Sequence, residues 1–529
     1  MYSGIVSPGW RVRVQRDAAG TRGATHGVWA AREMGNQRAG GGGAWPCSGA
    51  SLDGSARRVR LSTSRAPRAY SAPAYREMAH MLDPARTSPA AHRELARDIF
   101  AELIEIDTTD ATGDVTAAAE AMARRLRDAG FPDEDMVVVG PHPRKENLVA
   151  RLRGDGSGAP ILCLAHLDVV DADPAEWQTD PFTLVEEDGF FYGRGTTDQK
   201  AMSSIWIANL IRMRAEGIVP SRDIVVVLTA DEEGGEHNGA RWLVENRRDL
   251  VEAAFGINEG GFGRMRGGER ISNVVQASEK VYLDLELEAR GSAGHSSLPT
   301  PDNSIYHLAA AVGRIANYHF PVQLGEVARA FFERMAEIES GPLADDMRAL
   351  LQTPPDEAAA ARLSRVPQYN GTLRNTWAVT RMDAGHSNNT IPQSARAVVN
   401  CRLLPGESPE AVERTLNEVV GDGPVTVRQL KAAKPSPPSP LTPGVIGAVE
   451  RITEAMWPGV PVVPVMGIGA TDSLYFRQAG IPMYGVSGIF LDVDDVRAHA
   501  PDERISVASY FEGQEFLYRL VRELGSAAG

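Results

Sequence analysis

The sequence predicts an α/β protein in which strands alternate with helices in layers. Short apolar runs rich in Val and Ile, such as 161–164 and 223–228, are typical of buried strands. Segments with apolar residues at helical spacing, such as 90–106 and 200–216, lie beside those runs in the chain. Polar and acidic clusters follow several strands directly, and that edge is where open α/β sheets bind ligands.

Composition narrows the class of protein. The length of 529 residues predicts two or more domains, and the net charge of -14 argues against nucleic-acid binding, which needs a basic surface. No run of 18 apolar residues is present, so we expect no membrane span. The three cysteines form no CxxC pair, which argues against a disulfide framework or a thiolate zinc site, and we expect Cys163 and Cys401 to be buried thiols.

The N-terminal segment 1–88 differs from the rest. Its first eighty residues carry twelve Arg, no Lys and four acids, and clusters of Gly, Ala, Ser and Pro interrupt any periodicity. We expect disorder there, or an extension upstream of a true start at Met78 or Met81. The segment lacks the apolar core of a signal peptide, so the sequence favours a cytoplasmic protein and leaves export open.

The elements follow in order along the chain. Between residues 89 and 280 we expect helices at 90–106, 116–129, 200–216 and 238–246. We expect strands at 136–139, 147–152, 160–164, 223–228 and 253–257.

The middle of the chain, 281–432, is expected to form a separate domain. We expect strands at 282–289, 395–403 and 425–430, the first with alternating apolar and polar residues. We expect helices at 304–318 and 409–420, and two further helical patterns within 324–351. A proline-rich segment, 434–440, then leads back, because proline suits neither a helix interior nor a central strand. The last part, 433–529, returns to the first domain with 445–456, 461–466, 473–478, 482–486 and 506–524.

The first chemical motif lies at the end of strand 160–164. Alternation places His166 and Asp168 on one side, and a carboxylate two residues from a histidine commonly orients the imidazole toward a metal. Asp198 follows in a glycine-flanked loop before a helix. Alone, that aspartate is equally well explained as a helix N-cap.

Two acidic clusters farther along the chain share one pattern, in which a strand is followed by a carboxylate and then by two glycines. Glu232 and Glu233 follow strand 223–228 and precede two glycines, and Glu259 precedes two more. In the extended backbone that follows a strand, the side chains of adjacent residues point in opposite directions. One of the two glutamates can therefore bind a metal while its neighbour faces a water. The alternatives are solvated surface acids and, for His499 near the C-terminus, a structural histidine.

Together the motifs resemble a family: the co-catalytic zinc peptidases and deacylases that include carboxypeptidase S, glutamate carboxypeptidase, succinyl-diaminopimelate desuccinylase and aminoacylase. The resemblance covers about 89–524 and is greatest to the carboxypeptidase S branch, through 176–182, 233–239 and 469–473. It implies a catalytic domain with a mixed central sheet flanked by helices, and an inserted α+β lid domain through which a homodimer can form. It also implies a cis peptide bond after Asp198.

The resemblance implies two zinc ions, with cobalt or manganese possible, on five ligands. Asp198 bridges the ions; His166 and Glu259 complete the first ion, and Glu233 and His499 the second.

The resemblance also assigns catalytic roles. Asp168 orients a ligand histidine, and Glu232 is the general base that accepts the proton of a water bridging the metals. His295, in the lid, contacts the reacting carbonyl and in many members enters the site of a partner subunit. The alternative for His295 is an exposed loop histidine.

Four residues are expected to hold the substrate. Asn389 and Arg402 match lid positions on the carboxylate side, although Arg402 is equally well explained as a strand-edge cation. The glycine-rich loop with Gly469 and Thr471 precedes a helix and can turn N–H groups toward a carboxylate.

The predicted function is therefore hydrolysis of an amide bond next to an amino acid with a free carboxylate. The substrate is a small peptide or an N-acyl amino acid, which makes the protein a carboxypeptidase or a deacylase. A dipeptidase that needs a free amine is one alternative, although the sequence offers no dedicated acid for that amine. A catalytically silent binding protein is the other, and the intact Glu232 argues against it.

Overall fold

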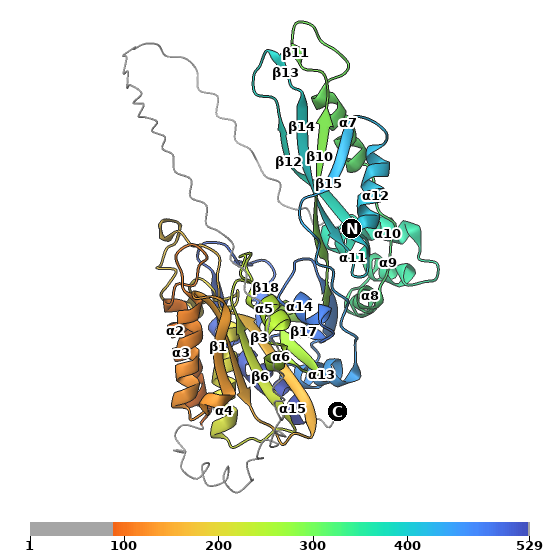
Figure 1. Ribbon diagram of the computed structural model, residues 1–529. Coiled ribbons are helices and arrows are strands. Elements are labelled where there is room, and N and C mark those ends of the chain that lie inside the picture. The colour runs from red at the N-terminus through yellow and green to blue at the C-terminus, as the bar shows by residue number, and fades with distance from the viewer. Residues whose placement is uncertain (1–87, 527–529) are drawn as a thin grey trace, which may run out of the picture. The chain divides into compact units, whose positions relative to one another are not determined.

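The computed structural model describes residues 88–526 (Figure 1). The expected disorder of 1–88 falls outside the described residues, except for Ser88, whose side chain caps the first described helix. None of the described helices is long and apolar enough to cross a membrane.

The larger sheet has ten strands and mixed directions, as the resemblance implied. Along its path the strands are β1 (Met136–His142), β2 (Lys145–Leu152), β6 (Arg222–Thr229), β3 (Gly158–His166), β7 (Phe255–Asn258), β17 (Met483–Gly485), β9 (Glu269–Glu279), β8 (Gly263–Arg266) and β18 (Phe490–Asp492), with β16 (Val462–Gly467) paired to β9. Strand β3 is parallel to β6 and to β7, whereas β1, β2 and β6 are antiparallel. The carboxyl ends of β3, β6 and β7 therefore meet at one edge of the sheet.

Helices cover both faces of this sheet (Figure 1). One face packs against α2 (Pro89–Glu105), α3 (Val115–Asp128), α4 (Lys200–Ala215), α13 (Pro443–Met456) and α15 (Val507–Ser526). The other packs against α5 (Gly239–Asn246), α6 (Arg248–Val251) and α14 (Ser473–Gln478). Alternation divides each central strand between the two cores, so Cys163 joins the first and Leu164 the second. Both faces are apolar, which explains the continuous apolar runs in the sequence.

A second sheet, of four strands, forms in the middle of the chain. Its order is β12 (Thr376–Ala384), β14 (Ser394–Leu403), β10 (Val281–Arg290) and β15 (Val425–Gln429). Helices α7 (Ser304–Ala316) and α12 (Pro409–Val420) pack on it and close a core of its own. At one end of β10 and β14, the short strands β11 (Gly294–His295) and β13 (Thr390–Ile391) pair with each other.

A group of four helices extends the middle segment: α8 (Glu326–Ile338), α9 (Pro342–Leu350), α10 (Glu357–Leu363) and α11 (Pro367–Leu373). Helix α8 packs against β16 of the larger sheet, where Phe331 and Phe332 share a core with Val463. The two helical patterns expected in 324–351 are confirmed as α8 and α9. These helices thus cover an edge strand of the larger sheet rather than the four-stranded sheet.

Several strands were not predicted. Strand β9 is buried along most of its length but carries Ser272, Asn273, Gln276 and Glu279, so its sequence lacks an apolar run. Strands β8 and β12 were also missed, as was a small sheet of β4 (Val185–Glu187), β5 (Phe190–Tyr192) and β19 (Arg504–Ser506). The three-residue strands β4, β5 and β19 and the four-residue strand β8 offer too few residues for a period to be visible. The expected buried thiols, Cys163 and Cys401, are both fully buried.

Candidate metal centre

Five side chains converge at the carboxyl edge of the larger sheet. His166 is the last residue of β3, and Glu233 and Glu259 follow β6 and β7. Asp198 lies in the loop before α4, and His499 lies between β18 and β19. These are the five candidate ligands of the sequence prediction, brought together from segments more than 300 residues apart.

Asp198 lies between the two imidazoles. Its Oδ1 is 3.0 Å from Nε2 of His166, and its Oδ2 is 3.2 Å from Nε2 of His499. One carboxylate therefore presents one oxygen to each histidine, which is the geometry of a bridging ligand. The peptide bond between Asp198 and Gln199 is cis, as the resemblance implied.

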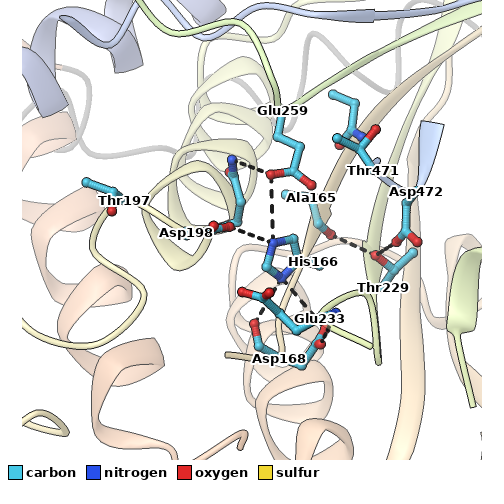
Figure 2. Close-up of polar contacts among 12 residues, drawn as sticks. Ala165, His166, Asp168, Thr197, Asp198, Thr229, Glu233, Glu259, Thr471 and Asp472 are labelled. Atoms are coloured by element: carbon cyan, nitrogen blue, oxygen red, sulfur yellow. Dashed lines mark hydrogen bonds and ion pairs between the residues drawn. The ribbon is translucent and has the colours of Figure 1, made fainter. Parts of the chain in front are cut away.

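Each imidazole has a second carboxylate. Oε2 of Glu259 is 3.8 Å from Nε2 of His166, and Oε1 of Glu233 is 3.1 Å from Nε2 of His499. The residues thus form two groups of an imidazole and a carboxylate that share Asp198. Figure 2 shows the first group, with the His166 ring facing Asp198 and Glu259.

The donor set fits divalent cations. Ligand atoms of His166, Asp198 and Glu233 lie within 4.8 Å of one another, and imidazole nitrogens with carboxylate oxygens are ligands of zinc, cobalt and manganese. Burial raises the pKa of Glu259 to about 8 and that of Glu233 to about 7, with Asp198 also contributing, because several acids share a recessed site. Two divalent ions would offset this repulsion and keep the carboxyls ionised.

His166 is held by the backbone rather than by the carboxylate of Asp168. Its Nδ1 is 2.9 Å from the carbonyl oxygen of Asp168 and 3.7 Å from the carboxylate oxygen Oδ1. An Nδ1–H that donates to this carbonyl leaves the Nε2 lone pair facing the candidate ligands. The carboxylate was expected to accept this hydrogen bond. Instead its Oδ2 accepts from the backbone N–H of Glu233 at 3.0 Å, so Asp168 ties the loop after β6 to the end of β3.

The acidic cluster after β6 divides into three environments. Asp231 is buried and paired with Lys145 at 2.8 Å, so it organises the loop. Glu232 and Glu233 both line a polar cavity of about 480 Å³. Glu233 also faces His499, whereas the ligand atoms of Glu232, His166 and Glu259 lie within 4.8 Å of one another. Burial and then the charge of Glu259 raise the pKa of Glu232 well above its usual value. A partly buried carboxyl beside the candidate ligands, and facing a cavity, has the position of a proton acceptor.

Glu503 is a positioning residue that the sequence did not single out. It is fully buried and accepts hydrogen bonds from Arg194 Nη1, the N–H groups of Gly195, Thr197 and Asp198, and the Thr197 hydroxyl, at 2.6 to 3.1 Å. One carboxylate thereby fixes the backbone that carries Asp198. The only signal in the sequence was its position four residues after His499.

Gln199 and Asp472 also support the site. The Gln199 side-chain amide donates to Oε2 of Glu259 at 2.9 Å. Asp472 accepts from the Thr229 hydroxyl at 2.6 Å and from the Asn238 amide at 2.7 Å, which connects α14 to the end of β6 (Figure 2).

Arg402 and the glycine-rich loop meet each other. Nη1 of Arg402 donates to the carbonyl oxygen of Ile468 at 3.2 Å, and its guanidinium lies 4.6 Å from the centre of the Tyr282 ring. Gly469 is exposed, and Thr471 lines the polar cavity. The N–H of Thr471, expected to face a substrate carboxylate, donates to Glu279 at 3.0 Å, because the buried ion pair of Glu279 with Arg477 takes up the nearby donors.

His295 and Asn389 lie elsewhere. Both are exposed, and they meet beside the paired strands β11 and β13, where the Ser296 N–H donates to the Asn389 carbonyl at 2.9 Å. Strand β10 begins beside the polar cavity and runs ten residues to this end, which is about 30 Å at the usual rise per residue. Within the described chain, the structure does not bring either side chain to the candidate metal centre.

Comparison with known proteins gives one family and a consistent set of relatives. Residues 162–523 match the model of peptidase family M20/M25/M40. The N-fatty-acyl-amino acid synthase/hydrolase PM20D1 of Xenopus tropicalis is 33% identical over 354 residues, which cover 66% of this chain and 69% of that protein. A carboxypeptidase S-like protein of Dictyostelium discoideum is 28% identical and covers 71% and 74%. The M20 metallo-carboxypeptidase Sso-CP2 of Sulfolobus solfataricus superposes with a TM-score of 0.61 at 18% identity, covering 81% of this chain and 99% of that one.

Proposed function

The chain belongs to peptidase family M20/M25/M40 and is a hydrolase, and we propose that it uses two zinc ions to cleave the amide bond of N-acyl amino acids. The observation that carries this proposal is Asp198, whose two oxygens face one histidine each, with Glu259 and Glu233 completing the two groups. The family match of the sequence analysis, made on these motifs, is confirmed. The name of the vertebrate relative supports an acyl amino acid as substrate.

Glu232 is proposed as the group that moves the proton. Two divalent ions held by the five candidate ligands would lower the pKa of water and polarise the amide carbonyl. Glu232 then accepts the proton of the attacking water and passes it to the leaving amine. Its pKa is raised by burial, and a carboxyl with a pKa nearer to neutrality can both take up and release a proton.

The free carboxylate of the amino acid is proposed to lie beside Arg402 and the loop with Gly469 and Thr471. The guanidinium is already oriented by the Ile468 carbonyl and the Tyr282 ring, and its planar fork suits a carboxylate. The neighbouring polar cavity adds the cations Lys431 and Lys434.

We further propose that His295 and Asn389 act in the site of a second copy of the chain. Their position at the far end of β10 supports this, because a homodimer would let that end reach another metal centre. The exposed His295 imidazole has only Ser297 as a hydrogen-bond partner among the described residues and is available to a substrate carbonyl.

A substrate panel tests the proposed activity. The zinc-loaded protein is offered N-acetyl and N-dodecanoyl amino acids, N-blocked dipeptides with a free C-terminus, and free dipeptides. We expect release of the amino acid from the acyl amino acids. Cleavage of blocked dipeptides alone would instead indicate a carboxypeptidase, and a strict need for a free amine would indicate a dipeptidase. Two bound metal ions without any turnover would point to a silent binding protein.

A further inference from the structure

Two cavities with different lining side chains adjoin the candidate metal centre. The polar cavity contains Glu232 and Glu233, and charged side chains make up much of its wall. A second cavity, of about 400 Å³, begins at Gly260, next to the candidate ligand Glu259. The two share Ala470 and Thr471, so the loop 467–471 separates them.

The second cavity is walled mainly by hydrocarbon. Strands β8, β9 and β16 form its floor, and α8 and α11 cover it. Its apolar wall includes Phe262, Val274, Phe331, Val465 and Met466. An apolar cavity of this volume is of the size that holds a small organic ligand.

Gln276 gives the cavity one polar end beside the metal centre. The side chain is 5% exposed and lines the cavity. It lies against two glycines: a Cβ on Gly260 would come within 2.6 Å of its Oε1, and one on Gly467 within 2.4 Å. An amide that lines the cavity at this end can hydrogen-bond a polar group of a ligand.

The cavity is long. It extends along β9 from Gln276 to Ser272, four residues and about 13 Å at the usual strand rise. The half-buried Arg264 lies opposite Ser272 on β8 and marks the outer end. A single amino-acid side chain would fill only the inner part of this space. An acidic side chain would also leave its carboxylate among Val274 and Phe331, short of Arg264, which desolvation disfavours.

From this arrangement we propose that the second cavity binds the acyl chain of the substrate, while the amino-acid end occupies the polar cavity. This inference rests on the proposed function and names the substrate class: N-acyl amino acids with medium or long alkyl chains. An amphiphilic substrate matches two adjoining cavities, one charged and one apolar. The Gln276 amide hydrogen-bonds the amide group at the junction, and the helices of 326–373 make the enzyme selective for chain length.

Chain-length kinetics on three variants tests this assignment. Val465→Trp fills the cavity from the floor and Gln368→Trp from the exposed surface of α11, while Val366→Trp, 42% exposed at the start of α11 and outside the cavity, is the matched control. The substrates are N-acetyl, N-hexanoyl and N-dodecanoyl derivatives of one amino acid. For the unmodified protein we expect kcat/KM to rise about fourfold per methylene until the cavity is full.

Both filling variants should lower kcat/KM for the dodecanoyl substrate by about tenfold or more and leave the acetyl substrate within about twofold. The control should keep the full dependence on chain length. Equal losses on all three substrates, or no loss in either filling variant, would overturn the assignment. Gln368→Trp changes an exposed position, so the test stands even where Val465→Trp fails to fold.

Binding separates failure of this inference from failure of the proposed function. Titration calorimetry with N-dodecanoyl glycine needs no turnover. Weaker binding to both filling variants than to the control supports the acyl cavity, even if the substrate panel shows no hydrolysis. Equal binding to all the proteins overturns the acyl cavity, even if the panel shows hydrolysis.

Discussion

The carboxyl edge of the larger sheet and the far end of the four-stranded sheet both carry residues expected to be catalytic, but they are built differently. At the first, buried partners hold the candidate ligands: Glu503 fixes the backbone of Asp198, and Asp168 joins the His166 strand to the next loop. At the second, the exposed side chain of His295 is hydrogen-bonded only to Ser297 of its own loop among the described residues.

The difference reflects what each group must do. A ligand to a metal must stay within a few tenths of an ångström, so its supporting hydrogen bonds matter almost as much as the ligand itself. A residue that contacts substrate only during reaction can arrive from elsewhere. The comparison therefore predicts that changes at the sheet edge affect metal binding and stability, whereas changes at the far end affect turnover alone.

The largest effect is expected from Glu232→Ala. Loss of the proton acceptor should lower kcat by about 10³-fold, within the usual range for a general base, while metal content stays unchanged. Turnover of an N-acyl amino acid and metal analysis by mass spectrometry measure the two quantities. Glu236→Ala, an exposed acid of the same loop, is the control and should retain both. A Glu232→Ala protein with normal turnover would remove the proton-transfer role, and one without metal would make Glu232 a ligand.

His295→Ala tests the far end. Loss of a donor to the reacting carbonyl should lower kcat by about 10²-fold, and metal content and the unfolding midpoint should not change because the residue is exposed.

Mixing the inactive His295→Ala and Glu232→Ala proteins then asks which copy supplies the histidine. In a homodimer with exchanged far ends, each mixed dimer has one intact site, so an equilibrated mixture should recover about a quarter of the unmodified activity. No recovery, in dimers shown to have exchanged subunits, would mean that His295 acts within its own chain.

Glu503→Gln should disturb the carboxyl edge of the larger sheet without replacing any candidate ligand, because it alters a hydrogen-bond acceptor of the Asp198 backbone. The amide keeps one acceptor oxygen but leaves the buried Arg194 charge without its partner at 2.7 Å. We expect metal affinity to fall about 10-fold to 100-fold and the free energy of unfolding to fall by about 3 kcal/mol. Competition with a chelator and denaturant unfolding give the two values.

The control for this variant is Glu512→Gln, which breaks an ion pair with Arg270 that is about one-third exposed. It should cost less than about 1 kcal/mol of unfolding free energy and leave metal affinity unchanged. If Glu503→Gln behaves like Glu512→Gln, the hydrogen bonds around Asp198 are not what fixes the centre.

The sequence predicted the α/β class and the elements whose apolar runs are continuous. Strand ends and neighbouring glycines singled out His166, Asp198, Glu233 and Glu259, but it was the resemblance to the family that supplied the set of five candidate ligands, His499 included. His166 at the end of β3 and Glu259 after β7 are the clearest cases. What escaped prediction is polar and buried: Glu503, Gln276 and most of β9 carry side chains that a sequence suggests are exposed. Their burial is decided by partners far away in the chain, such as Arg194 for Glu503, which no local period reveals.

The separation of His295 and Arg402 along the four-stranded sheet was the other quantity that the sequence could not predict. His295 and Arg402 were both assigned to the substrate, yet they lie near opposite ends of the four-stranded sheet. Strand register decides this: Arg402 pairs with Tyr282 at the beginning of β10, whereas β11 follows the end of β10. The sequence supplied both residue types but not the length that separates them.

The smallest effect is expected from Arg402→Lys, at the end of the four-stranded sheet that contacts the loop 467–471. Lysine keeps the positive charge but loses the planar fork, so it cannot hold both the Ile468 carbonyl and two oxygens of a carboxylate. We expect KM for an N-acyl amino acid to rise about tenfold with kcat nearly unchanged, because the contact is made equally before and during reaction. Arg396→Lys, on the same strand and paired with Glu288 at the surface, should change neither constant.

A substrate whose carboxylate is replaced by an amide or a methyl ester tests what the guanidinium binds. With this substrate, Arg402→Lys and the unmodified protein should have the same KM, since the carboxylate is what the guanidinium is proposed to bind. If the difference persists with the ester, Arg402 acts by bracing the loop 467–471, and the carboxylate site must be sought among Lys431 and Lys434 of the polar cavity.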